Sequence, residues 1–130
     1  MTNDAQVPPP PPPPPSDAPI AAYPKADSNQ RTEAVIAHGG GILLTWLIPL
    51  LVYMSSSAET KPFTHAHAKE ALNFQITIFI GLVLSNLVPL IGGLLTIAIF
   101  VVSVVLGIKG MIAANAGESF RYPFAIRFIN

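Results

Sequence analysis

The chain has 130 residues, of which 51% are hydrophobic and only 11% are charged, and its formal net charge is zero. Soluble domains carry about 25% charged residues, so we expect a small bundle in lipid, with neither a separate soluble domain nor a nucleic-acid partner. The chain lacks cysteine, which excludes disulfides, thiolate metal sites and cysteine nucleophiles.

Residues 1–33 are rich in proline, alanine, aspartate and serine, with eight consecutive prolines at 8–15. Such a segment buries too little apolar surface to offset the entropy of ordering, so a disordered proline-rich tail is predicted. The proline run is expected to form a polyproline II rod, either as a ligand for an aromatic groove or as a spacer, and the spacer is preferred because no Arg or Lys flanks the run. No basic start followed by an apolar core precedes residue 34, so we expect no cleavable signal peptide.

Two long stretches contain no Asp, Glu, Lys or Arg, namely 34–58 and 71–108. A bilayer core about 30 Å thick needs about 20 apolar residues per helix, so the first stretch fits one span and the second fits two. The predicted fold is therefore an all-α integral membrane bundle of three transmembrane helices, formed by residues 34–130. The expected spans are 35–54, 67–87 and 94–114.

The first expected span carries Pro49 in its middle. A proline inside a helix lacks its own N–H and presses on the carbonyl four residues earlier, here that of Thr45, so we expect a kinked helix. The alternative is a first segment that is re-entrant and broken at Pro49.

Small and polar residues along the second expected span recur every three or four positions, which places them on one helix face. This stripe should face other helices rather than lipid, either in helix packing or along a polar path. Its members are Glu70, Asn73, Thr77, Gly81 and Ser85.

Residues 86–93, with Pro89, Gly92 and Gly93, are the only breaker cluster in the long uncharged stretch, so a helical hairpin is expected to turn there. The third expected span has its own stripe of small residues, which permits close backbone approach. We expect it to pack on the second span, with a homodimer as the alternative. Its members are Ser103, Gly107, Gly110 and Ala114.

Apolar residues occupy every second position from Phe120 to Phe128. Period two predicts an extended segment, and we expect residues 118–130 to lie in the headgroup region or to fold back beneath the bundle. The candidate interfacial anchors are Lys69, Lys109, Arg121, Tyr122 and Arg127.

Three spans place the N-terminal tail and the 86–93 turn on one side, and the 55–70 connection and the C-terminus on the other. The second side carries more Lys and Arg, and such an excess marks the cytoplasmic face. The N-terminus is therefore predicted on the outer side of the inner membrane and the C-terminus on its cytoplasmic side. A re-entrant first segment would reverse the placement of the N-terminal tail.

His65, His67 and Glu70 cluster near the start of the second span, and His38 lies at the start of the first. Three straight spans would put His38 and His67 on opposite faces of the bilayer, so no metal site is predicted. The sequence shows no catalytic triad, no phosphate loop and no paired carboxylates in the spans. We therefore expect no enzyme, no catalytic residues, no cofactor and no small-molecule substrate.

Residues 62–78 (PFTHAHAKEALNFQITI) and 117–129 (GESFRYPFAIRFI) carry a family resemblance. Over residues 31–130 the chain resembles the small prokaryotic membrane domain of unknown function that is grouped with the chloroplast inner-envelope import component. The resemblance implies a compact multi-helix membrane domain whose residues 67–73 open the second span.

The preferred function is that of a non-enzymatic accessory or assembly partner in the bacterial inner membrane, bound to lipid and to other membrane proteins or to further copies of itself. The alternative is a small transporter or a component of a protein-translocation channel, in which the stripe from Glu70 to Thr77 lines a polar path. The two hypotheses differ in whether that stripe faces water or is covered by another part of the protein.

Overall fold

The computed structural model describes residues 26–130, so the proline run at 8–15 lies outside the described residues. Four helices follow in order: α1 Ser28–Leu44, α2 Leu47–Met54, α3 Pro62–Asn86 and α4 Gly92–Ala116. No strand occurs between residues 26 and 130, which confirms the predicted all-α class.

Helix α1 includes the last six residues of the expected tail, so residues 28–33 are helical rather than disordered. The start is set by Asp27, whose side-chain oxygen accepts a hydrogen bond of 2.8 Å from the backbone N–H of Gln30. An aspartate at the N-cap with a glutamine three residues later is a capping-box pattern, and it was the signal in the sequence for this helix start.

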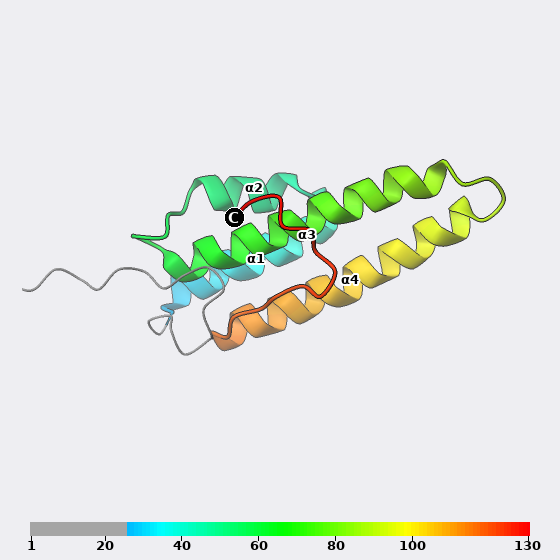
Figure 1. Cartoon of the computed structure of the whole chain (residues 1–130). Coiled ribbons are helices and arrows are strands. Elements are labelled where there is room, and N and C mark those ends of the chain that lie inside the picture. The colour runs from blue at the N-terminus through cyan, green and yellow to red at the C-terminus, as the bar shows by residue number, and fades with distance from the viewer. Residues whose placement is uncertain (1–25) are drawn as a thin grey trace, which may run out of the picture.

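The stretch 35–54, predicted as one membrane-spanning helix, is two short helices that fold back on each other (Figure 1). The chain reverses at Thr45, which has φ 52° and ψ −123°. The helices approach so closely that a Cβ on Gly40 would lie 2.2 Å from the Ile48 side chain. The prediction of a single kinked span is therefore wrong, and the first segment is a helical hairpin.

Pro49 does not kink a helix, because it lies at the third position of α2. The first backbone N–H groups of a helix have no partner within that helix, so a proline there removes no hydrogen bond. The interruption between the two helices lies at Thr45, four residues before the proline.

Helices α3 and α4 form a second, longer hairpin of 25 residues each, and both are long and apolar enough to cross a membrane. They turn through residues 87–91, where Leu90 has a positive φ of 68°. Helix α4 ends at Gly117, whose φ of 76° permits the backbone N–H groups of Gly117 and Glu118 to bond the carbonyls of Ala114 and Ala113.

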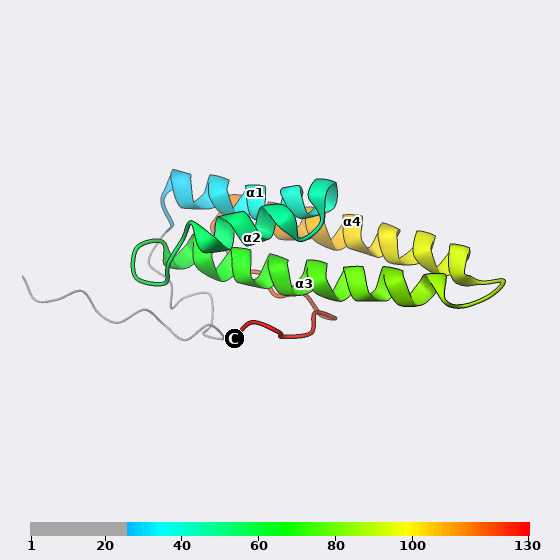
Figure 2. The same ribbon diagram turned by 90° about the horizontal axis from the view of Figure 1, so that it is seen from above.

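The two hairpins lie side by side but differ in length, so the α3–α4 hairpin extends alone beyond the turn between α1 and α2 (Figures 1 and 2). We call the end at which α1 begins, α2 ends, α3 begins and α4 ends the charged end, and residues 87–91 the tip. Every charged residue of the described chain lies toward the charged end, because segments 34–58 and 71–108 carry none.

Candidate functional site

The polar stripe on α3 is covered by the last residues of the chain, which we call the C-terminal strap (residues 118–130). The side chain of Asn73 is only 1% exposed. Its Oδ1 accepts hydrogen bonds from the backbone N–H groups of Phe128 (3.0 Å) and Ile129 (2.9 Å), and its Nδ2 donates to the carbonyl of Ile129 (2.9 Å). One amide side chain thus satisfies three backbone groups that would otherwise need a neighbouring strand.

Glu70 and Thr77 hold the same strap one turn to either side of Asn73. Oε1 of Glu70 accepts from the backbone N–H of Tyr122 (2.6 Å) and from the guanidinium of Arg127 (2.9 Å). Oγ1 of Thr77 accepts from the backbone N–H of Ile126 (2.9 Å). Backbone polar groups that are shielded from water need partners within the protein, and these three side chains provide them for the strap.

A chain of buried hydrogen bonds joins α1, α3 and the strap. Nε2 of His38 lies 2.8 Å from Nδ1 of His67, and Nδ1 of His38 lies 2.8 Å from the hydroxyl of Tyr122. Nε2 of His67 lies 3.0 Å from the carbonyl oxygen of Glu118. Both imidazoles are fully buried or nearly so, at 0% and 2% exposure.

The carbonyl of Glu118 fixes the donor and the acceptor in every hydrogen bond of this series, because a carbonyl oxygen can only accept. Nε2 of His67 must therefore carry the proton, which leaves its Nδ1 to accept from Nε2–H of His38. Nδ1 of His38 is then free to accept from the hydroxyl of Tyr122. Two neutral imidazoles and one phenol satisfy one another completely, with one proton in each link.

Tyr122 fills the centre of this arrangement rather than the membrane interface. It is 2% exposed, and its ring stacks on Phe74 with centroids 3.8 Å apart and planes at 3°. Burial, and then the nearby Glu70 carboxylate, raise the pKa of the Tyr122 phenol well above its ordinary value, so the phenol stays protonated and donates. The prediction that Tyr122 is an interfacial anchor is wrong.

The other predicted anchors divide between two environments. Lys109 and Arg121 are exposed toward the charged end, and Lys69 is half-buried there. Arg127 instead turns inward to Glu70, with 26% of its side chain exposed.

The far half of the α3 stripe faces α4 and not the strap. The hydroxyl of Ser85 lies 2.8 Å from that of Thr96, and a Cβ on Gly81 would lie 3.5 Å from Ile99. The stripe therefore serves two neighbours, the strap near the charged end and α4 near the tip.

The small residues of α4 face α1, although their spacing predicts packing on the second span, which is α3. A Cβ on Gly107 would lie 2.9 Å from Ile42, and a Cβ on Gly110 would lie 2.6 Å from Nδ1 of His38. Ser103 and Ala114 are buried on the same face. Gly110 thus provides the space that the His38 imidazole occupies.

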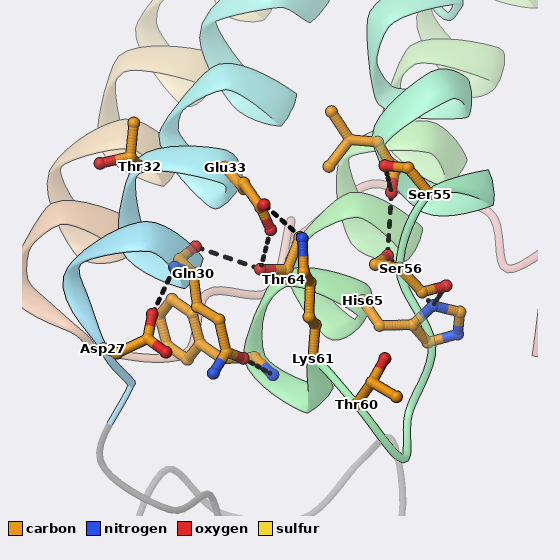
Figure 3. Close-up of polar contacts among 12 residues, drawn as sticks. Asp27, Gln30, Thr32, Glu33, Ser55, Ser56, Thr60, Lys61, Thr64 and His65 are labelled. Atoms are coloured by element: carbon orange, nitrogen blue, oxygen red, sulfur yellow. Dashed lines mark hydrogen bonds and ion pairs between the residues drawn. The ribbon is translucent and has the colours of Figure 1, made fainter.

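A second polar cluster closes the charged end (Figure 3). The carboxylate of Glu33 accepts hydrogen bonds from Nζ of Lys61 and from the hydroxyl of Thr64. Oε1 of Gln30 accepts a hydrogen bond of 3.2 Å from the backbone N–H of Phe63. On the other side of the connection, Nδ1 of His65 lies 3.1 Å from the carbonyl oxygen of Ser56. These contacts join the start of α1, the 55–61 connection and the start of α3.

Some of these groups line a shallow hollow of ≈ 370 Å³ on the surface: Asp27, Asn29, Gln30, Thr32, Glu33, Thr60 and Lys61. Among residues 26–130, no three His, Cys, Asp or Glu side chains converge in the way a metal ion requires. The chemistry of both polar clusters is mutual hydrogen bonding between segments of the chain.

The pairing of His38 with His67 was not predicted from the sequence, because a straight first span would separate them by the thickness of a bilayer. The hairpin at Thr45 brings the starts of α1 and α3 to the same end of the bundle. The run of Gly39, Gly40 and Gly41 was the available signal, since a Cβ at either of the last two would lie 2.6 Å or less from a side chain of α2 or α3.

Fold and site together define a small all-α protein with a membrane-suited hairpin, closed by its own C-terminal strap. Residues 29–129 match the magnetosome magnetite crystal formation protein family, MamF/MmsF. The chain therefore belongs to that family. The resemblance to the family of the chloroplast import component is overturned by this match. No curated protein and no solved structure gives a significant match.

Proposed function

We propose that this chain is a non-catalytic integral membrane protein that supports magnetite crystal formation in the magnetosome as an accessory or assembly component. The observation that carries the proposal is the family match over residues 29–129, which covers all four helices and nearly the whole strap. The apolar α3–α4 hairpin supports the membrane location.

We further propose that both ends of the described chain lie on the cytoplasmic face. The first helical pair returns to the end from which it starts, which favours the re-entrant alternative over three full spans with the N-terminus outside. The charged end carries every basic residue of the described chain, and an excess of Lys and Arg is typical of the cytoplasmic side. These residues are Arg31, Lys61, Lys69, Lys109, Arg121 and Arg127.

The covered stripe favours an assembly role over transport. A polar path needs Glu70, Asn73 and Thr77 to face water, but each of them bonds the backbone of the strap. Because these three side chains hold the strap, the strap lies over the face of α3 that a passing solute would have to reach.

The test is genetic complementation in a magnetite-forming bacterium whose copy of this gene has been deleted. We expect the deletion to change the size or shape distribution of the crystals in electron micrographs, and the wild-type gene to restore it. Asn73→Ala is expected to restore it incompletely, whereas the matched Asn86→Ala, whose amide bonds only Leu82 of its own helix, is expected to restore it fully. Unchanged crystals after deletion would refute the proposal.

A further inference from the structure

The two ends of the bundle differ in how many segments stand side by side. Toward the charged end, α1, α2 and the strap pack beside α3 and α4 (Figures 1 and 2). Beyond the turn at Thr45, α3 and α4 continue alone to the tip. The molecule is therefore broad at one end and narrow at the other.

This taper matches the thickness of one leaflet. From Glu33 to Leu44, α1 rises about 16 Å, and from Glu70 to Asn86, α3 rises about 24 Å, at about 1.5 Å per residue. The strap reaches along α3 only as far as Thr77, which Ile126 contacts. Since half of a bilayer core is about 15 Å thick, the first helical pair and the strap fill the near leaflet and only the α3–α4 hairpin enters the far one.

The tip itself is built for lipid. It carries no charged residue, and its side chains are strongly exposed, with Leu87 at 73%, Leu90 at 105% and Ile91 at 52%. Exposed leucine and isoleucine side chains at the end of a hairpin are unfavourable in water, because transfer of apolar surface from water to an apolar medium lowers the free energy. The narrow end therefore favours the lipid of the far leaflet.

We propose that this protein recognises and stabilises curved bilayers, with the charged end on the convex face. The ligand is the bilayer itself. A body with a larger cross-section in one leaflet expands that leaflet relative to the other, and the strain is relieved when the membrane bends away from the broad end. The proposal rests on the membrane placement given above, and its test separates the two.

The full chain is reconstituted at low density into phosphatidylcholine–phosphatidylglycerol vesicles of two sizes. Because the chain has no cysteine, Glu59→Cys in the connection at the charged end gives a single site for a membrane-impermeant fluorescent maleimide. In vesicles about 50 nm wide we expect about threefold more protein per lipid than in vesicles about 400 nm wide. Nearly all charged ends should be labelled from outside in the small vesicles, and about half in the large ones.

A matched pair of variants links the effect to the taper. Asn73→Ala removes three hydrogen bonds to the strap, so it should narrow the broad end and reduce the enrichment in small vesicles, whereas Asn86→Ala should leave the enrichment unchanged. Equal density and random orientation of the wild-type chain in both vesicle sizes would overturn the curvature proposal and leave the membrane placement intact. Failure to float with vesicles of either size would overturn both.

Discussion

His38 and His67, 29 residues apart in the chain, face each other through ring nitrogens 2.8 Å apart in the buried centre of the bundle. Their contact requires that α1 and α3 start at the same end, and it depends on the reversal of the chain at Thr45. The pair also positions the strap, because His67 bonds the carbonyl of Glu118 and His38 bonds Tyr122.

His38→Ala is expected to destabilise the protein by about 3 kcal/mol or more, because it leaves Nδ1 of His67 and the hydroxyl of Tyr122 buried without partners. Tyr122→Phe keeps the stack on Phe74 and removes one donor, so it should destabilise by about 1 kcal/mol. Denaturant unfolding in detergent micelles, followed by circular dichroism, measures both. Equal stability of His38→Ala and wild type would contradict the hydrogen-bonded chain.

Asn73→Ala is expected to release the strap. Loss of three hydrogen bonds, at about 1 kcal/mol each, should expose the bonds after Arg121 and Arg127 to trypsin. Limited proteolysis in micelles should therefore shorten the C-terminus of this variant several-fold faster than that of wild type or of Asn86→Ala. Identical cleavage rates in all three proteins would show that Asn73 does not hold the strap.

Thr45→Gly is expected to stabilise the protein by about 1 kcal/mol, since a β-branched residue is strained at a φ of 52° and glycine is not. If residues 35–54 formed one continuous helix, the same change would instead destabilise the protein by about 0.3–0.5 kcal/mol, because glycine has a lower helix propensity than threonine. Thr32→Gly, inside α1, is the control and should destabilise. The sign of the change in unfolding free energy at residue 45 decides between the hairpin and the single span.

Single cysteines test the placement of the segments across the membrane. Asn29→Cys at the start of α1 and Glu59→Cys in the connection are expected to react with an impermeant maleimide from the same face, the cytoplasmic one, in oriented membrane vesicles. Leu90→Cys at the tip should not react from that face. Labelling of residues 29 and 59 from opposite faces would contradict the re-entrant hairpin and support three membrane spans.

Asp27 makes the start of α1 sensitive to acid. The hydrogen bond from the backbone N–H of Gln30 holds the pKa of the Asp27 carboxyl below its ordinary value of 3.8. A carboxyl whose pKa is lower in the folded state adds stability above its unfolded pKa and loses that contribution as the pH falls through the folded pKa. The difference in unfolding free energy between wild type and Asp27→Ala should therefore be largest at neutral pH and should shrink below about pH 4. The corresponding difference between Asp27→Asn and Asp27→Ala should not change with pH in this range, because an amide does not titrate. A difference between wild type and Asp27→Ala that does not change with pH would exclude the carboxylate cap.

The long uncharged stretch was enough to predict the α3–α4 hairpin, because a run of apolar residues with one breaker cluster around Pro89 has few other solutions. The reversal at Thr45 could not be predicted in the same way. A hydropathy pattern indicates that residues 34–58 prefer lipid, but it does not show whether the chain continues or reverses there. Thr45 itself is not a residue type that marks a turn.

Periodicity identified the face of α3 that carries Glu70, Asn73 and Thr77, but not its partner. The alternation of apolar residues in 118–130 predicted an extended segment, whereas the strap has no regular secondary structure and turns at residues 123–124. Most of the hydrogen bonds that join the two run from these side chains to backbone groups that every residue has, so they leave no mark in the sequence of the strap. The exception is Arg127, whose guanidinium pairs with Glu70.

The strap is synthesised after α3, yet it supplies the partners of side chains buried in α3. In the proposed membrane placement, α3 enters the bilayer during translation before the amide of Asn73 and the carboxylate of Glu70 have partners, because both are satisfied only after the ribosome has released residues 122–129.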